Sequence, residues 1–221
     1  MRCSPSRSAG VLLLLVVSSV ASASRDEKDK PDPFVDRVVG FIVGEGGGNG
    51  EAELPDIVLG PPQGGGKLAP GDHVLSLGKG GQITLEFVDN EVIDGEGVDL
   101  LIFENAFLRD PGNDAGDGFF EPAKVEVSAD GKEWKTFPHD RTTRRGCAGT
   151  HPVLANSIDN DINPTDPEKA GGDPFDLSDV GLKVVRFVRI TDLDNAGGLN
   201  GTAGFDLDAV AAVHTRPREA K

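Results

Sequence analysis

The amino-acid sequence predicts an all-β protein, an antiparallel β-sandwich with long acidic loops. Short strand-like segments alternate with turns along a chain that contains 30 glycines and 15 prolines, and no helix-period pattern follows the N-terminal apolar region. The clearest segment is 121–138. Residues 123–128 alternate between apolar and polar side chains, and Asp130-Gly131 favours a two-residue primed turn. We expect a hairpin here, with Trp134 of the return strand in the core.

Further strands are expected along the whole chain. Residues 98–103 form a nearly continuous apolar run, which is typical of a central strand covered on both faces. Residues 73–77 and 82–87 flank a glycine-rich turn and are expected to form a second hairpin. A single helical turn is expected within 175–182, after a long irregular segment at 139–175. A loop of that length is usually functional or ordered by a metal. The remaining expected strands are 38–43, 57–59, 183–191 and 205–214.

The N-terminal region has the pattern of a secretory signal peptide. Arg2 and Arg7 precede an apolar run at 11–17, and Ala21-Ser22-Ala23 provides a cleavage site. We therefore expect export to the cell surface, the extracellular space or the periplasm, with no membrane insertion after cleavage. The expected organisation is a signal peptide at 1–23, a flexible charged lead-in at 24–36, one sandwich domain at 37–215 and a short tail at 216–221.

The chain is strongly acidic, with a formal net charge of −15 that becomes −17 once Arg2 and Arg7 are removed. Such a surface repels nucleic acids and anionic lipids and attracts cations. Cleavage also removes Cys3, which leaves Cys147 without a partner for an internal disulfide. Cys147 is expected to be a small buried side chain, with an intermolecular bridge or a catalytic thiol as the alternatives.

Two stretches resemble the discoidin-like, galactose-binding-like jelly roll. Residues 125–134 (VEVSADGKEW) match a strand that ends in Ser-x-Asp-Gly-x-x-Trp, and residues 185–191 (VRFVRIT) match its Val-Arg-Tyr-Val-Arg-Ile partner. The resemblance implies that these segments pair. The wider sequence is similar to a group of bacterial exported "cell surface protein" sequences, some of which carry PEP-CTERM-type sorting tails. The motifs of this similarity are Leu75-Ser76-Leu77-Gly78, Ile102-Phe103-Glu104-Asn105, Glu121-Pro122-Ala123, Cys147-Ala148-Gly149, GDPFDL at 172–177 and GFDLDAV at 204–210. The printed sequence ends soon after the last expected strand, and we expect no sorting tail of this kind.

An acidic run in the irregular segment favours binding of Ca²⁺. Asp159, Asp161 and Asn163 supply oxygen atoms at alternate positions, and Asp166 follows. Ca²⁺ requires six to eight oxygen ligands from a flexible backbone. The run is not an EF-hand, because its glycine and bidentate-glutamate positions hold other residues. The alternative is that these side chains are solvated turn formers.

Acidic residues near the ends of the core strands are further candidates. Strand periodicity places Asp206 and Asp208 on one face, about 7 Å apart, where they repel each other unless a cation or an arginine lies between them. In the resembling domains a structural calcium is often held near the final strand, and the resemblance implies this role for Asp206 or Asp208. Glu104, Asn105 and Asp173 are candidate ligand-binding residues.

Catalytic signatures are absent from the sequence. It contains no G-x-S-x-G elbow, and its four histidines lack H-E-x-x-H spacing. Glu104 could be a metal ligand, a catalytic carboxylate or an ion-pair partner of Arg186 or Arg189. The expected function is therefore a non-enzymatic, calcium-binding module that binds a glycan or another cell-surface or extracellular component. The alternatives are a secreted hydrolase that uses acidic residues such as Glu104, and a structural envelope protein.

Overall fold

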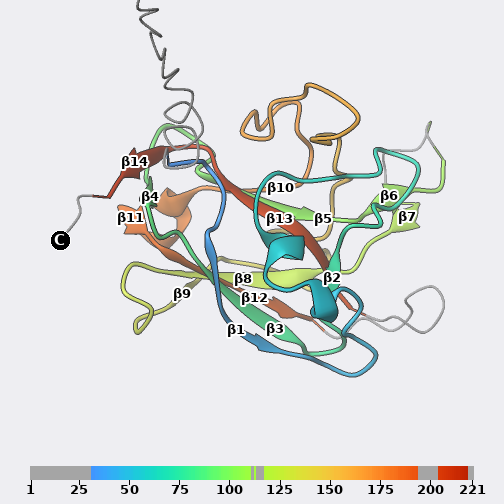
Figure 1. The fold of residues 1–221 in the computed structure, drawn as a ribbon, viewed down its shortest axis with the longest axis horizontal. Coiled ribbons are helices and arrows are strands. Elements are labelled where there is room, and N and C mark those ends of the chain that lie inside the picture. The colour runs from blue at the N-terminus through green and yellow to red at the C-terminus, as the bar shows by residue number, and fades with distance from the viewer. Residues whose placement is uncertain (1–30, 111, 113–116, 194–203, 219–221) are drawn as a thin grey trace, which may run out of the picture. The chain divides into compact units, whose positions relative to one another are not determined.

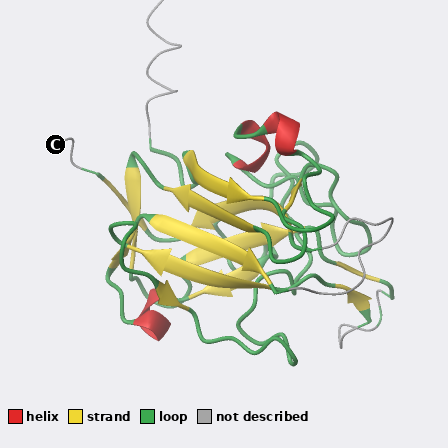
Figure 2. Cartoon of the chain, turned by 90° about the horizontal axis from the view of Figure 1, so that it is seen from below, coloured by secondary structure: helices red, strands yellow, loops and turns green. Residues whose placement is uncertain are grey.

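The computed structural model describes residues 31–110, 112, 117–193 and 204–218, and these residues form the predicted antiparallel β-sandwich (Figures 1 and 2). Helical structure in them is limited to the short 3-10 turns Glu51–Glu53 (η1), Asp56–Val58 (η2) and Leu177–Val180 (η3). The last of these confirms the helical turn expected after residue 175. No helix in this part of the chain is long and apolar enough to cross a membrane.

Two sheets supply the layers of the sandwich, and all their strand pairs are antiparallel. The first has the order β1-β3-β12-β8-β9, with β1 at Arg37–Ile42, β3 at Gln82–Glu86, β12 at Phe187–Asp192, β8 at Ala123–Ser128 and β9 at Lys135–Thr136. The second has the order β10-β5-β13-β2, with β10 at Asp173–Phe175, β5 at Leu100–Glu104, β13 at Asp206–Ala212 and β2 at Leu75–Ser76.

Two small sheets lie at opposite ends of the sandwich (Figure 1). One consists of β11 (Val184–Val185), β4 (Asn90–Ile93) and β14 (Thr215–Pro217). The other pairs β6 (Phe107–Leu108) with β7 (Gly118–Phe119). The β6–β7 pair borders the candidate site.

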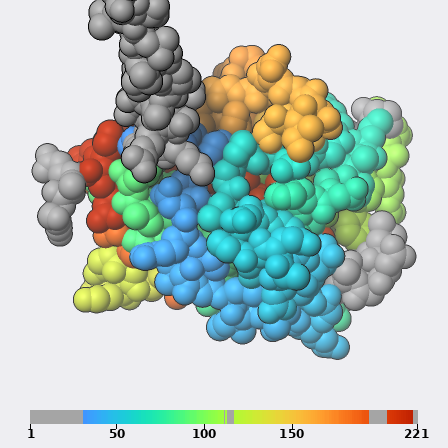
Figure 3. Space-filling view, viewed as in Figure 1, coloured from blue at the N-terminus to red at the C-terminus, as the bar shows by residue number. Residues whose placement is uncertain are grey.

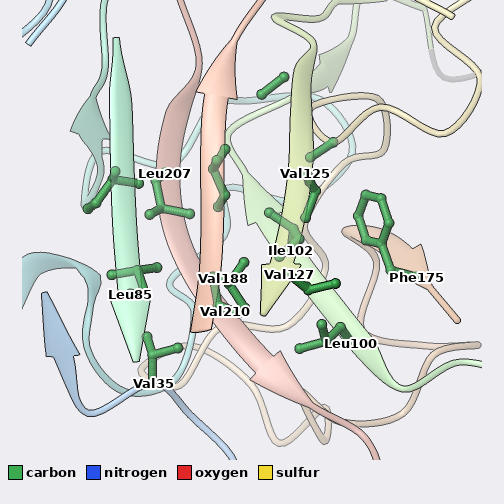
Figure 4. Packing of buried hydrophobic residues seen from close by; sticks show 14 of the residues in the cluster. Val35, Leu85, Leu100, Ile102, Val125, Val127, Phe175, Val188, Leu207 and Val210 are labelled. Atoms are coloured by element: carbon green, nitrogen blue, oxygen red, sulfur yellow. The ribbon is translucent and has the colours of Figure 1, made fainter. Parts of the chain in front are cut away.

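The main core lies between the two large sheets (Figure 4). Val125 and Val127 of β8 and Val188 of β12 face Ile102 of β5 and Leu207 of β13, and all five are fully buried. Each such aliphatic side chain stabilises the fold by about 1.5–3 kcal/mol through burial. The alternating valines of residues 123–128 are thus core residues, as their periodicity predicts.

A second apolar cluster covers the outer face of the second sheet. The irregular 150–171 segment lays Val153, Ala155 and Ala170 against Phe103 of β5 and Ala209 of β13. In the space-filling view this segment forms an orange protrusion along one edge of the molecule (Figure 3). Because this segment covers the outer face, β5 is buried on both faces, as the continuous apolar run of residues 98–103 predicts.

The 121–138 hairpin is confirmed, but its turn differs from the prediction. β8 pairs with β9, and β8 also pairs with β12 in the register Val127↔Val188. The connection spans residues 129–134 rather than two residues. Positive φ occurs at Gly131 but not at Asp130, whose carboxylate instead accepts hydrogen bonds from the Lys132 and Glu133 amides at 2.9 and 3.0 Å. Side-chain capping therefore replaces the primed turn.

Trp134 is not a core residue. Its side chain is only partly buried, and the Arg189 guanidinium lies 4.1 Å from its ring centroid. The longer turn moves Trp134 off the short return strand β9, whose two residues are exposed, while Phe137 enters the core. The indole ring therefore makes a cation–π contact at the sheet surface instead of packing in the apolar core.

Two other strand predictions are wrong. Residues 57–59 belong largely to η2, although Ile57 and Val58 are still buried in the core. Residues 73–77 and 82–87 do not form a hairpin, because β2 pairs with β13 while β3 pairs with β1 and β12 in the other sheet. The chain changes sheets at Gly78, where an added Cβ would lie 2.5 Å from the Gly47 amide nitrogen. That close backbone approach requires glycine.

The ordered domain begins earlier than residue 37. The prediction assigns residues up to 36 to a flexible lead-in, whereas Phe34 and Val35 are buried. The Ala212 amide donates a hydrogen bond to the Pro33 carbonyl at 2.7 Å, which ties this segment to β13. The predicted signal peptide and residues 24–30 lie outside the described residues.

Candidate functional site

Three carboxylates converge where β5 ends and β13 begins. Glu104 is the last residue of β5, Asp206 is the first of β13, and Glu121 lies two residues before β8. One carboxylate oxygen from each lies within 4.8 Å of the other two. Antiparallel pairing of β5 with β13 aligns Glu104 with Leu207, so the two strand ends place their acids side by side. We call Glu104, Glu121 and Asp206 the acidic triad.

Hydrogen bonds fix two members of the acidic triad. Asp206 accepts hydrogen bonds from the Ser76 hydroxyl on β2 and, at 3.1 Å, from the Asn105 side-chain amide. Glu121 accepts one from the Gly204 amide at 3.0 Å. Gly204 has a positive φ of 102°, and an added Cβ would lie 2.6 Å from the Gly78 carbonyl carbon, so glycine is required for this approach.

Glu104 differs from the other two members. Its side chain is 1 % exposed, and its Oε2 atom is buried without a hydrogen-bond partner among the described residues. A buried carboxylate oxygen that lacks a partner is costly, because the group has lost its hydration without compensation. Glu104 therefore needs a proton or a bound cation beside it.

The electrostatics of the triad point in the same direction. Burial, followed by the charges of Asp206, Glu121 and Asp173, raises the pKa of Glu104 well above its ordinary value. Burial and Asp206 raise the pKa of Glu121 to about 8. Burial also raises the pKa of Asp206, although hydrogen bonds from Ser76 and Asn105 oppose this effect. Without a cation, these carboxyl groups share protons at neutral pH.

A cavity of about 280 Å³ borders two members of the triad, Glu121 and Asp206. Glu121, Asp206, Ser76 and Asn105 line it, and so do Phe107 of β6 and Phe119 of β7. The two phenyl rings stack with their centroids 5.6 Å apart. The cavity thus combines oxygen-bearing groups with an aromatic wall. Its remaining lining residues are Asn49, Pro70, Gly71, Asp72 and Val74.

The acidic run of the irregular segment is separate from this cluster. Asp159, Asp161 and Asn163 are exposed, and Asp166 forms an ion pair with Lys169 at 2.6 Å. The Asn163 carboxamide oxygen accepts a hydrogen bond from the Thr165 amide at 3.0 Å. Among the described residues, these aspartates do not join a group of three converging ligands. Binding of a metal there stays a prediction.

Asp208 is not a member of the acidic triad and has hydrogen bonds of its own. A β-bulge between Leu207 and Ala209 interrupts the alternation, so Leu207 faces the main core whereas Ala209 faces the outer cluster. Both Asp208 oxygens accept hydrogen bonds from the Gln63 amide, at 2.9 and 3.1 Å. Burial raises the pKa of Asp208 to about 7, and the Gln63 hydrogen bond opposes this rise. Phe205 and Leu207 lie in the main core, as strand periodicity predicts, and the shared face of Asp206 and Asp208 stays a prediction.

Asp173 and Asn105 lie beside the triad in different ways. The Asn105 amide contacts Asp206 directly. Asp173, at the start of β10, is buried and accepts hydrogen bonds from the Gly149 and Thr150 amides at 2.7 and 3.1 Å, and it contacts His151. Its charge contributes to the raised pKa of Glu104. Asp173 therefore influences the triad electrostatically.

The ion-pair alternative for Glu104 is wrong. Arg186 pairs with Glu86, and Arg189 pairs with Glu126 at 2.8 Å. Sequence reasoning also missed Glu121 and Ser76 as site residues. Glu121-Pro122-Ala123 is one of the motifs of the family resemblance, but nothing local shows that Glu121 meets the ends of two strands from the other sheet.

A second group of acids, Asp94, Asp99 and Asp176, is fully used by the fold. Asp94 pairs with Lys183, and the two Asp99 oxygens each accept a backbone amide at 2.8 Å, from Gly95 and Leu177. Asp176 caps η3. This group therefore has a structural role that requires no ion.

Sequence comparisons add no assignment. No protein-family model matches the chain, and no curated protein is significantly similar to it. The geometry of the triad and its cavity is therefore the basis for the proposed function.

Proposed function

We propose that this protein is an exported, non-enzymatic module that binds Ca²⁺ at the acidic triad and uses the adjoining cavity to bind a glycan of the cell surface or extracellular space. The observation that carries the proposal is the buried, unpartnered Oε2 of Glu104 beside the carboxylates of Glu121 and Asp206. A cation at this position would compensate all three charges at once.

Ca²⁺ suits the donor atoms of this site. Hard cations prefer carboxylate, amide and hydroxyl oxygens to nitrogen or sulfur. Glu104, Glu121 and Asp206 would be the charged ligands, while Asn105 and Ser76 lie next to Asp206. Ca²⁺ completes its shell with water or ligand oxygens, which the cavity can supply. Bound there, Ca²⁺ would supply a fixed positive charge that attracts sugar hydroxyl groups.

The shape and lining of the cavity support a glycan as the ligand. Small-molecule sites are concave and combine apolar walls with a few polar groups. The stacked Phe107 and Phe119 rings provide the apolar wall, and Asn105 and Asp72 add hydrogen-bonding groups. The pairing of β8 with β12 is also the one that the resemblance to galactose-binding-like domains implies.

A hydrolase is the second candidate, because a pKa of about 8 keeps Glu121 protonated at neutral pH, as a general acid must be. The spacing disfavours it. Retaining glycosidases place their two carboxyl groups about 5–5.5 Å apart, and inverting enzymes place them farther apart. The triad oxygens converge within 4.8 Å, a spacing better suited to shared coordination of one ion.

Thermal unfolding with Ca²⁺ and with a chelator tests the metal part of the proposal. Ca²⁺ at 100 times Kd should stabilise the folded state by about 2.7 kcal/mol. That corresponds to a rise in Tm of about 5–10 °C for a domain of this size. No shift at millimolar Ca²⁺ would contradict the proposal.

A glycan array probed with and without Ca²⁺ tests the binding part. We expect Ca²⁺-dependent binding that Glu121→Gln abolishes and Glu168→Gln, an exposed control, retains. Release of sugar product by the wild type, with its loss in Glu121→Gln, would favour the hydrolase. Blank arrays with folded, Ca²⁺-loaded protein would count against a glycan ligand while leaving the metal site intact.

A further inference from the structure

A second cavity, of about 450 Å³, adjoins the loop that carries Cys147. Arg144, Arg145, Thr150 and His151 contribute polar groups to its wall, and Phe120 contributes an aromatic ring. Two arginines and a histidine thus line this cavity in a chain of net charge −15, together with the buried carboxylate of Asp173. The acidic triad and its ligands do not require any of these five residues.

The two arginines of this cavity have no carboxylate partner among the described residues. Arg37, Arg109, Arg186, Arg189 and Arg216 all form ion pairs with acids. The Arg144 guanidinium instead lies 4.3 Å from the Phe120 ring centroid. The charge of Arg145 helps to lower the pKa of Asp140, whose Oδ1 accepts hydrogen bonds from the Thr142 and Thr143 amides, but the two side chains form no ion pair. Guanidinium donors therefore line the cavity in an acidic chain.

Backbone hydrogen bonds fix the course of the loop that carries these arginines. Arg144 is the one non-glycine residue with a positive φ, 62°, in the described part of the chain. Such a conformation persists only where its surroundings impose it. Here the Cys147 amide bonds to the Arg144 carbonyl at 3.2 Å, the Asp140 amide bonds to the Arg145 carbonyl at 2.9 Å, and Ala148 pairs with Ala123 of β8. The loop backbone is thus preorganised, which lowers the entropic cost of ligand binding.

His151 adds a third donor. Its Nδ1 lies 2.7 Å from an oxygen of the buried Asp173, which leaves Nε2 for another partner. The hydrogen bond that His151 donates to the Asp173 carboxylate raises the pKa of His151 and favours its cationic form. The neighbouring Cys147 thiol is buried, and burial with the nearby acids raises its pKa to about 11, so it is not a nucleophile at neutral pH. The cavity is equipped for binding an anion rather than for thiol chemistry.

We propose that this cavity binds the oxyanion group of an acidic sugar, a carboxylate, sulfate or phosphate, through Arg144, Arg145 and His151. Guanidinium groups bind planar or tetrahedral oxyanions through charge-assisted, often bidentate hydrogen bonds. The acidic remainder of the surface repels extended polyanions, so the site selects compact ligands. This inference does not depend on the cation site.

Isothermal titration of the full chain tests the inference. Galacturonate, glucuronate, galactose 6-sulfate and glucose 6-phosphate are the probes, with neutral galactose and free sulfate and phosphate as comparisons. We expect saturable binding of at least one acidic sugar, weaker binding of its neutral counterpart, and loss of affinity as salt concentration rises. Binding of free sulfate or phosphate as tight as that of the sugar would assign the site to the oxyanion alone and overturn the sugar assignment.

The variant Arg145→Gln should lower the affinity by about tenfold or more, because it removes a charge-assisted donor. Arg145 lies outside the positive-φ position, so the substitution leaves that conformation unchanged. Arg216→Gln, whose arginine pairs with Glu91 on β4, is the matched control and should bind as the wild type does. Equal affinities for wild type and Arg145→Gln, equal binding of galactose, or no saturable binding by folded protein would overturn the proposal.

Discussion

Glu104, the last residue of β5, carries the main functional argument because its environment is incompatible with an isolated charge. Its side chain is 1 % exposed, and one oxygen lacks a hydrogen-bond partner in the described structure. Its neighbours Glu121 and Asp206 are acids rather than bases. At the residue scale, the chain must therefore hold protons or a cation at this point, and the two states respond differently to pH.

The metal-free protein should become less stable as pH rises from about 5 to 8. Unfolded glutamates ionise near pH 4.3, whereas the pKa of Glu121 in the folded protein is about 8 and that of Glu104 is also raised. The folded state therefore binds more protons over this range, so the free energy of unfolding decreases with increasing pH. Urea unfolding in chelator at several pH values measures the slope.

Two comparisons make this pH prediction specific. Glu121→Gln should flatten the slope, and Glu168→Gln, which alters an exposed side chain, should leave it unchanged. Ca²⁺ should reduce the decrease, since a bound cation replaces the protons. A free energy of unfolding that rises between pH 5 and 8 in chelator would contradict the proposed environment of the triad.

Among the strands, β5 is buried on both faces because the irregular 150–171 segment covers its outer face. Phe103 is fully buried there against Val153 and Ala155. We expect Phe103→Ala to cost about 3–5 kcal/mol of unfolding free energy, as other large-to-small core substitutions do. Ile158→Ala in the same segment should change stability by less than about 0.5 kcal/mol, because Ile158 is 74 % exposed.

Urea unfolding of both variants measures the difference. A loss below about 1 kcal/mol in Phe103→Ala would show that the 150–171 segment is not a stabilising cover.

Strand periodicity predicted the elements that face the main core, such as β3, β5, β8 and β12. It failed where geometry depends on distant contacts. The bulge between Leu207 and Ala209 arises in the pairing of β13 with β5, which no local pattern encodes. β2 pairs with β13 and not with β3, the next strand in the sequence, although the residues of β2 and β3 suit a hairpin. Glu104 and Asn105 could be identified as site candidates, whereas Glu121 joins them only through the packing of two sheets.

At the scale of the whole molecule, the acidic composition is not uniform in its consequences. Acids such as Asp94 and Glu126 form ion pairs with basic side chains. The triad instead brings three acids together beside a cavity. Asp173 contributes to both proposed sites, because its charge raises the pKa of Glu104 and its carboxylate accepts a hydrogen bond from His151. One domain thus contains both the proposed cation site and the cavity lined by Arg144 and Arg145.

Equilibrium titration of Ca²⁺ into the chelator-treated protein, followed by calorimetry, tests the central claim most directly. Wild type should bind one Ca²⁺ at the triad. Glu104→Gln should lose that binding, while its fold is preserved because the neutral amide removes a buried charge. Asp159→Asn, which alters the exposed acidic run, should bind Ca²⁺ as the wild type does. No Ca²⁺ binding by wild type, or binding that survives Glu104→Gln and disappears in Asp159→Asn, would contradict the account.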